Sequence, residues 1–437
     1  MRVSLKSSRY AAVALSGAIV LASALNTSGP ALAGSSGKPL LIRGVVESSE
    51  LEGVFCITAA NCWAVGEQTI NHATLNLVLH WTGRHWARVS VPNPGGIRNG
   101  DSSELFGIRC TSASNCWTVG HAQKLFHADL DEALHWNGKK WSAVPTPTPA
   151  GILSGDNNRL DDVTCTSAAR CLAVGTYGTT TSSSTGNSVV ALNQALRWNG
   201  KVWSLVSTPN PAGTSPNHGN ALNSVRCTSA TNCWAGGTYG TITAISQSTE
   251  HNQILHWNGK KWTKATVPNP EGTNAGSVND IEGLACTAVT NCWAAGLTGH
   301  VSSDPSTTEI FNEIFHWNGK KWRNQVIPQP GGGGAGTDDA LNGITCSTAR
   351  NCWAVGSRSH TTAGTPTLNE ALRWNGAKWS SVSTPNPGGT GMGDTSELNS
   401  ARCTTAANCW AVGFSQASTG QETAERLHWT GKKWFVG

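Results

Sequence analysis

Fourteen cysteines have the most regular spacing of the reactive residues in this sequence. They form seven pairs in which the second cysteine lies six residues after the first. A zinc site usually shows C-x-x-C spacing or histidines that complete a tetrahedral set, and neither recurs beside these pairs. We therefore predict no metal site, and instead seven disulfides formed in an oxidising compartment: Cys56–Cys62, Cys110–Cys116, Cys165–Cys171, Cys227–Cys233, Cys286–Cys292, Cys346–Cys352 and Cys403–Cys409.

Three carboxylates, Asp156, Asp161 and Asp162, lie close together in the third copy of a repeat. Paired carboxylates can act as acid and base in glycoside cleavage. With Asn157 and Asn158 they also offer oxygen ligands for calcium, although the spacing matches no calcium-binding loop. We treat the three as candidate ligand-binding residues, assign no catalytic residue and expect no cofactor.

The repeat itself recurs seven times, once from each leading cysteine. In every copy two late tryptophans, such as Trp81 and Trp86, lie five residues apart, and in the first six copies the second of them lies 24 residues before the next leading cysteine. The length of the unit still varies from 54 to 62 residues. All of this variation therefore falls in one connection, between the C-W-A-V-G segment and the late tryptophans.

Each unit predicts four short strands bounded by Gly, Pro, Asn or Ser; in the sixth unit they cover residues 341–346, 352–356, 370–374 and 378–382. No helical period appears, and radial repetition of such units shields most sheet edges. The predicted fold class is all-β: a seven-bladed β-propeller of four-stranded antiparallel blades with one hairpin disulfide per blade. A stacked β-solenoid is the alternative, but its rungs are usually much shorter.

The start of the chain predicts export. Residues 1–33 resemble a secretory signal peptide, because a basic start (Arg2, Lys6, Arg9) precedes an apolar run and an A-x-A cleavage site. Residues 34–50 form an N-terminal segment in which residues 40–46 could add a closing strand or pack as a clasp. Residues 51–437 form the propeller. We expect a secreted, extracellular monomer without a membrane span.

The charges of the predicted mature chain are balanced overall but sorted by connection. After residues 1–33 are removed, 28 basic and 26 acidic residues remain, which does not indicate a nucleic-acid partner. The turns between the first and second and between the third and fourth strands carry no carboxylate. We predict a basic face at these turns, able to orient an anionic polymer or simply to protect edge strands from aggregation, formed by Lys139, Lys140, Lys260, Lys261, Lys320, Lys321, Lys432 and Lys433.

The twenty tryptophans fall into three series within the repeat. Six follow the second cysteine, with Leu172 in the place of the seventh, and two further series of seven begin and end the last hairpin. Such regular placement predicts packing between blades, although tryptophans can also stack on sugars. If any series is exposed, we expect it to be the last: Trp86, Trp141, Trp203, Trp262, Trp322, Trp379 and Trp434.

A weak resemblance to known propellers rests on the last hairpin. The sequence Gly138-Lys139-Lys140-Trp141 resembles the end of the Asp-box, S-x-D-x-G-x-T-W, of sialidase-like propellers, but Trp136 stands where that motif has its Asp. The pattern CTSAxNCWAVG followed by HWNGKKW resembles secreted repeat proteins of actinobacterial type. If the sialidase resemblance extended to the site, the tyrosine nucleophile could only be Tyr177 or Tyr239, which we include among the candidate ligand-binding residues.

Three classes of function remain open. The favoured hypothesis is a non-catalytic binding or scaffold protein that recognises a polysaccharide or cell-envelope polymer through the variable connections at residues 175–193, 237–252 and 296–312, which are rich in Ser, Thr and Gly. A hydrolase or lyase acting on glycans at the same face is the second, on fold analogy alone. An extracellular protein-interaction scaffold or inhibitor is the third.

Overall fold

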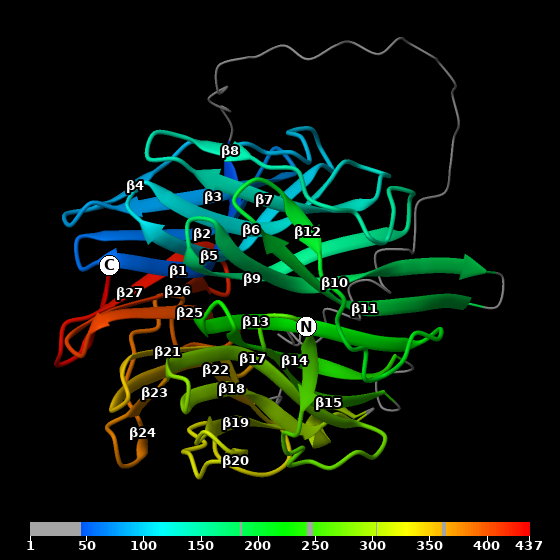
Figure 1. Cartoon of the computed structure of the whole chain (residues 1–437). Coiled ribbons are helices and arrows are strands. Elements are labelled where there is room, and N and C mark those ends of the chain that lie inside the picture. Colours follow the sequence, from blue (N-terminus) through cyan, green and yellow to red (C-terminus); the bar gives the residue numbers. More distant parts are fainter. Residues whose placement is uncertain (1–44, 184–185, 243–247, 303, 361–363) are drawn as a thin grey trace.

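The computed structural model describes residues 45–437, apart from 184–185, 243–247, 303 and 361–363. Within this part of the chain there is no α-helix, and 28 strands follow one another in seven sets of four, which we call units 1 to 7. A short 3-10 turn, η3 (Pro305–Thr307), lies in unit 5. The units are arranged around a common centre, with β8, β20 and β24 at the rim (Figure 1).

The strands of units 1 to 4 are β1 (Val46–Thr58), β2 (Asn61–Ile70), β3 (Ala73–Trp81), β4 (Trp86–Arg88), β5 (Ser102–Ser112), β6 (Asn115–Gln123), β7 (Asp129–Trp136), β8 (Trp141–Ala143), β9 (Asp156–Ser167), β10 (Arg170–Ser183), β11 (Gly186–Trp198), β12 (Trp203–Leu205), β13 (His218–Ser229), β14 (Asn232–Thr241), β15 (Thr249–Trp257) and β16 (Trp262–Ala265). Those of units 5 to 7 are β17 (Ser277–Ala288), β18 (Asn291–His300), β19 (Glu309–Trp317), β20 (Trp322–Asn324), β21 (Thr337–Thr348), β22 (Asn351–His360), β23 (Leu368–Trp374), β24 (Trp379–Ser381), β25 (Thr395–Thr405), β26 (Asn408–Gln416), β27 (Thr423–Trp429) and β28 (Trp434–Val436).

Each unit is an antiparallel meander whose first strand lies innermost. Single parallel pairs, Thr74 with Ser102, Val190 with His218 and Ile310 with Asp338, join neighbouring units, so the hydrogen-bonded sheets number three of eight strands and one of four. The predicted fold class, an all-β propeller of four-stranded units, is confirmed. Each unit also carries one disulfide between its first two strands, with Cα–Cα distances of 3.9 to 4.0 Å.

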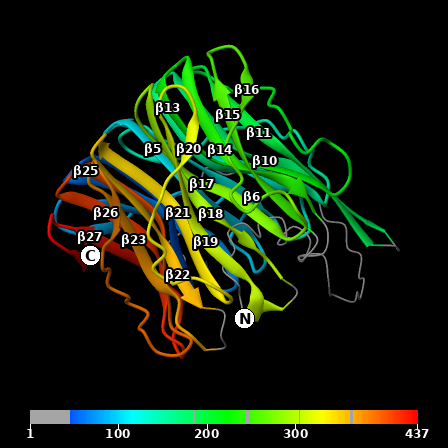
Figure 2. The same ribbon diagram turned by 90° about the horizontal axis from the view of Figure 1, so that it is seen from below.

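The second and third strands are longer than predicted. In unit 3 they pair as far as Ser183 with Gly186, and the resulting β10–β11 hairpin projects from the body of the molecule (Figures 1 and 2). The prediction that residues 175–193 form a loop was therefore wrong, and much of 237–252 and 296–312 is strand as well. Thr-rich runs favour extended pairing because a β-branched side chain fits the pleated surface.

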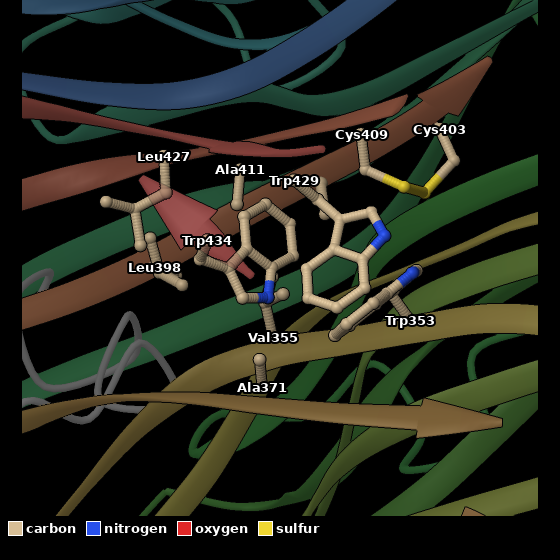
Figure 3. Packing of buried hydrophobic residues seen from close by; sticks show 11 residues of the cluster. Trp353, Val355, Ala371, Leu398, Cys403, Cys409, Ala411, Leu427, Trp429 and Trp434 are labelled. Atoms are coloured by element: carbon tan, nitrogen blue, oxygen red, sulfur yellow. A yellow bond between two sulfur atoms is a disulfide. The ribbon is translucent and has the colours of Figure 1, made fainter. Parts of the chain in front are cut away.

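Tryptophans fill the spaces between units. In every unit except unit 3, which has Leu172, the tryptophan of the second strand contacts both late tryptophans of the next unit. Trp353, for example, lies 4.7 Å from Trp429 and 5.1 Å from Trp434, measured between ring centroids (Figure 3). The angles of 59° and 79° between these rings are those that aromatic quadrupoles favour. The packing function predicted for these residues is confirmed.

A histidine recurs near the end of the third strand in five units, where it has a structural task. His80 stacks on Trp63 at 4.1 Å, and its Nε2 lies 3.0 Å from Asn61 Oδ1. The same hydrogen bond to an asparagine at the start of the second strand recurs at His135, His256, His316 and His428. Each histidine therefore joins the second and third strands of its own unit.

Units 7 and 1 pack as the other neighbours do, which closes the ring. Trp410 lies 4.9 Å from Trp81, and Asn399 Nδ2 donates to Leu51 O at 3.1 Å, as Asn342 Nδ2 donates to Leu398 O at the preceding junction. In Figure 1, β1 lies beside β25 although they come from distant parts of the chain. Of the segment 40–46 expected to help closure, residues 40–44 lie outside the described residues, and Val46 begins β1.

A second set of contacts between units is polar and buried. On the third strands, an asparagine side chain donates to a glutamate of the next unit: Asn76 to Glu132 at 2.6 Å, and Asn312 to Glu370 at 2.6 Å. Gln253 takes the place of this glutamate in unit 4, and its Nε2 also donates to two backbone carbonyls at 2.7 Å. Burial raises the pKa of Glu132 and Glu370 well above the usual value, and a protonated carboxyl can donate as Gln253 does.

Because the pKa of these buried carboxyls is raised, we expect the stability to fall as the pH rises from the unfolded carboxyl pKa toward the higher folded value. Burial raises the pKa of Glu425, which accepts from Asn369, to about 8. A raised carboxyl pKa gives stability that is complete below the unfolded value and is lost as the pH rises through the folded value, at about 1.4 kcal/mol per pH unit for each such group. The five recurring histidines have lowered pKa values and destabilise the fold only at acidic pH.

We expect Glu425→Gln to fold, because Gln253 accepts the corresponding hydrogen bond from Asn193. The variant should lose less free energy of unfolding than the wild type between pH 7 and pH 8, as measured by urea denaturation. The reverse variant, Gln253→Glu, places a carboxyl in the same buried position and should lose more. Identical pH dependence in all three proteins would contradict the protonated state of this carboxyl.

Candidate functional site

The inner strands of all seven units surround a cavity of about 320 Å³ on the central axis, which we call the axial channel. Every inner strand has a register shift one residue after its buried Leu or Ile, so one residue bulges out of the pairing. Bulges redirect side chains and are frequent beside functional sites. The bulged residues, all of which line the channel, are Glu52, Phe106, Asp161, Asn223, Glu282, Asn342 and Asn399.

The residue after the bulge is small in most units because neighbouring inner strands nearly touch. A Cβ on Gly53 would lie 2.4 Å from Phe106 O, and one on Gly107 would lie 2.7 Å from Asp162 Cα. These distances are shorter than van der Waals contact, so a side chain there would push the units apart. The glycines therefore set the width of the channel, and the other lining side chains set its chemistry.

Of the five predicted ligand-binding residues, Asp161 and Asp162 line the channel. Asp161 pairs with Arg159 at 2.9 Å. Asp162 accepts from Ser224 Oγ and Val225 N, both at 2.9 Å, and forms an ion pair with Arg226. Asp162 stands where most units have glycine or serine, and its contacts join units 3 and 4.

The other three predicted residues lie outside the lining of the channel. Asp156 begins β9, and its carboxylate accepts from Leu153 N at 2.8 Å, which stabilises a turn. Tyr177 on β10 and Tyr239 on β14 are half-buried, and Lys264 Nζ lies 4.1 Å from the centre of the Tyr239 ring. The five residues therefore do not line one cavity together, and their binding of a ligand stays a prediction.

Three arginines and one phenylalanine stand at the same register position, immediately before the first cysteine of their units. Arg109 and Arg402 extend from the units on either side of Phe55, and their guanidinium carbons lie 4.7 and 4.4 Å from its ring centre. Arg226 completes the set in unit 4. Burial, together with Arg402 and Arg226, lowers the pKa of Arg109 to about 9. The channel thus contains like charges that repel one another.

The arginines lie toward the face that carries the predicted basic residues. In each unit the turn after the third strand packs on the turn after the first: Trp136 Nε1 donates to Ala113 O at 3.1 Å, and a Cβ on Gly138 would lie 2.9 Å from Ser114 Cβ. Both kinds of turn therefore share one face, as predicted. The lysines at these turns are exposed: Lys139, Lys140, Lys260, Lys261, Lys320, Lys321, Lys432 and Lys433.

The last tryptophan series, which we expected to be the exposed one if any series were exposed, is largely buried. Trp141, Trp203, Trp262, Trp322, Trp379 and Trp434 are buried, and Trp86 alone is half-buried. Val89 and Val91, which follow β4, pack in the cluster around Trp141. Trp86 instead lines a groove of about 590 Å³ together with Arg84, Trp410, Arg426 and Phe435.

Comparisons with known proteins give structural similarity only. No protein-family model and no curated protein matches the chain. Among solved structures, the chain is similar to the β-propeller domain of the Trilobed protease from Pyrococcus furiosus (8% identity, TM-score 0.44, covering 89% of this chain and 97% of that one). It is also similar to an α-L-arabinanase of Penicillium chrysogenum (10%, 0.39, 77% and 95%) and to an α-L-arabinofuranosidase of Fusarium graminearum (11%, 0.38, 73% and 91%).

In the described part, no set of three or more His, Cys, Asp or Glu side chains is placed to hold a metal ion. No helix there is long and apolar enough to cross a membrane.

The channel arginines were missed in the sequence, although a signal was present. The position before the leading cysteine reads Phe55, Arg109, Thr164, Arg226, Ala285, Thr345 and Arg402, while the cysteines around it do not change. An alignment of the seven copies would have shown that the residue type at this position varies while the cysteine after it does not. That it faces the axis follows only from the closed ring.

Proposed function

We propose that this protein is a secreted, non-catalytic binding protein that receives the end of a glycan or other cell-envelope polymer in its axial channel. The observation that carries the proposal is the concentration of departures from sevenfold symmetry in the lining. The bulged position holds Glu, Phe, Asp or Asn, and the position before the cysteine holds Phe, Arg, Thr or Ala. The packing positions beside them keep their cysteines throughout and their tryptophans in nearly every unit.

The size of the channel supports a small ligand or the terminus of a chain. A cavity of about 320 Å³ lies at the lower end of the roughly 300–1,000 Å³ that small-molecule sites occupy. A folded protein partner could not enter it. The lining also combines aromatic rings with amide and charged groups, which suits a ligand that has both apolar faces and many polar atoms.

The disulfides support secretion, because seven pairs account for every cysteine in the sequence. Disulfides persist in oxidising environments and are rare in reducing ones. Residues 1–33 have the features of an export signal. Both observations agree with a ligand that is part of a cell envelope or of extracellular material.

A glycan-active enzyme is the second candidate, and one observation favours it. Glu67 on β2 lies opposite Glu50 on β1. Burial and the carboxylates of Glu104, Glu50 and Glu52 raise the pKa of Glu67 well above its usual value. A carboxyl whose pKa is raised by burial and by neighbouring carboxyl groups is the kind of group that glycosidases use for acid catalysis.

The test is a glycan array probed with the predicted mature chain, followed by calorimetry on the oligosaccharides that bind. Ala285→Phe should weaken binding by roughly tenfold or more, about 1.4 kcal/mol, because Ala285 lines the channel and Phe55 shows that its register position accepts a ring. The control is Ala377→Phe, which adds the same ring to an exposed turn.

The outcomes separate the candidates. Equal binding by both variants would place the ligand outside the channel and contradict the proposal, as would an array on which no glycan binds. Shortened products detected by chromatography, and absent with Glu67→Gln, would instead establish the enzyme.

A further inference from the structure

We propose that Arg109 and Arg402, on either side of Phe55, form a binding site for one anionic group, a carboxylate, sulfate or phosphate, carried by the ligand of the axial channel. This inference rests on the proposed function only for the identity of the larger ligand. The anion site itself depends only on three side chains, those of Arg109, Arg402 and Phe55.

The ion pairs of the channel involve only some of its charged residues. Among the described residues, Asp161 pairs with Arg159 and Asp162 pairs with Arg226. Asp162 also accepts hydrogen bonds from Ser224 and Val225, so its carboxylate is fully engaged. Glu52 and Glu282 also line the channel, but within the described part of the chain no ion pair joins a carboxylate to Arg109 or Arg402.

The two arginines also have donors that lack a hydrogen-bond acceptor. The Nε atoms of both Arg109 and Arg402 are buried and have no hydrogen-bond partner among the described residues. A buried donor on a charged group is costly to leave unpaired. An oxyanion in contact with both guanidinium groups would supply acceptors and reduce the repulsion at the same time, and guanidinium geometry suits carboxylate and phosphate oxygens.

Phe55 contacts both arginines without pairing their donors. Its ring is buried, and both guanidinium groups stack on it. Such cation–π contacts stabilise a cation by about 0.5–2 kcal/mol but satisfy none of its N–H donors. Phe55 therefore holds the two arginines in position while their donors stay available to a ligand.

The position of the arginines along the channel determines how a ligand reaches them. Ala285 and Thr345 have the same register position as the arginines, and the residues that follow them toward the turns, Cys286, Thr287, Cys346 and Ser347, also line the channel. This register position therefore lies at the end of the channel nearest the lysine-bearing face. Exposed lysines around that face would raise the local concentration of an anionic polymer. The channel would then bind the charged terminus of the polymer.

The experiment compares ligands that differ only in the anion. Glucuronate and glucose are titrated by calorimetry at fixed ionic strength, with inorganic sulfate and phosphate as separate probes. We expect glucuronate to bind and glucose not to bind measurably. Arg109→Gln and Arg402→Gln should each weaken glucuronate binding by about tenfold to a hundredfold, as expected for a lost charged hydrogen bond.

Arg170→Gln is the matched control, because it removes one exposed arginine from a turn on the same face but outside the channel. It should leave affinity within about twofold once salt screening is held constant. Arg109→Lys keeps the charge without the planar fork and should bind more weakly than the wild type but better than Arg109→Gln. Circular dichroism and melting temperature verify that each variant is folded.

Failure of this inference differs from failure of the proposed function. If glycans bind but neither arginine variant changes their affinity, the anion site is wrong and the proposed function stands. If sulfate or phosphate binds in an arginine-dependent way but no glycan does, the anion site stands and the glycan proposal falls. Equal affinity of glucose and glucuronate would overturn the anion site outright.

Discussion

Reduction of the seven disulfides is expected to unfold the protein at 37 °C. Each disulfide closes only a short loop between neighbouring strands, with a sequence separation of 6, so the chain-entropy model gives roughly 2 kcal/mol for each one. Seven together contribute on the order of 14 kcal/mol by the same estimate. Folded domains are stable by only about 5–15 kcal/mol in total, so the reduced chain should not keep a cooperative fold.

The measurement is thermal unfolding by circular dichroism, before and after reduction and alkylation. The double variant Cys110→Ala, Cys116→Ala isolates one bridge and should lose about 2 kcal/mol while staying folded. A reduced protein that melts within a few degrees of the oxidised one would show that tryptophan packing, rather than the disulfides, maintains the fold.

Replacement of Trp353 by alanine should be among the most destabilising single substitutions, at about 3–5 kcal/mol. Trp353 is fully buried and packs on Trp429 and Trp434 of the next unit (Figure 3), so its loss opens a cavity between units 6 and 7. The same contact between a second-strand tryptophan and the late tryptophans of the next unit recurs around the ring, and it stabilises the packing of neighbouring units. Urea denaturation gives the change in free energy.

The matched control is Trp86→Ala, which removes the same side chain from the half-buried position beside the groove. It should cost clearly less than Trp353→Ala, because less apolar surface returns to water. Equal losses at the two positions would contradict the ranking of the tryptophans by burial.

Periodic features were predicted well because they are local or repeat at a fixed distance. The pairing of Cys56 with Cys62 needs only six residues of chain, and Gly138, with its positive φ of 90°, marks a turn that Asn137 stabilises by accepting from two backbone amides. Neither depends on how the units are arranged. The all-β propeller followed from repeating such units.

Features that depend on contacts between strands far apart in the sequence could not be predicted in the same way. Arg109 and Arg402 are almost three hundred residues apart and come together only because the ring closes beside Phe55. The bulges that turn Asp161 and its equivalents toward the axis leave no clear sequence signal. The burial of Trp141 depends on Val89 and Val91, which belong to the preceding unit.

The central claim, that the axial channel binds its ligand through the arginines beside Phe55, is tested most directly by a crystal structure of the protein with glucuronate. The claim predicts density for the sugar within the channel, with its carboxylate in hydrogen-bonding distance of Arg109 and Arg402. A sugar found in the groove beside Trp86 or on the β10–β11 hairpin, with an otherwise empty channel, would contradict it.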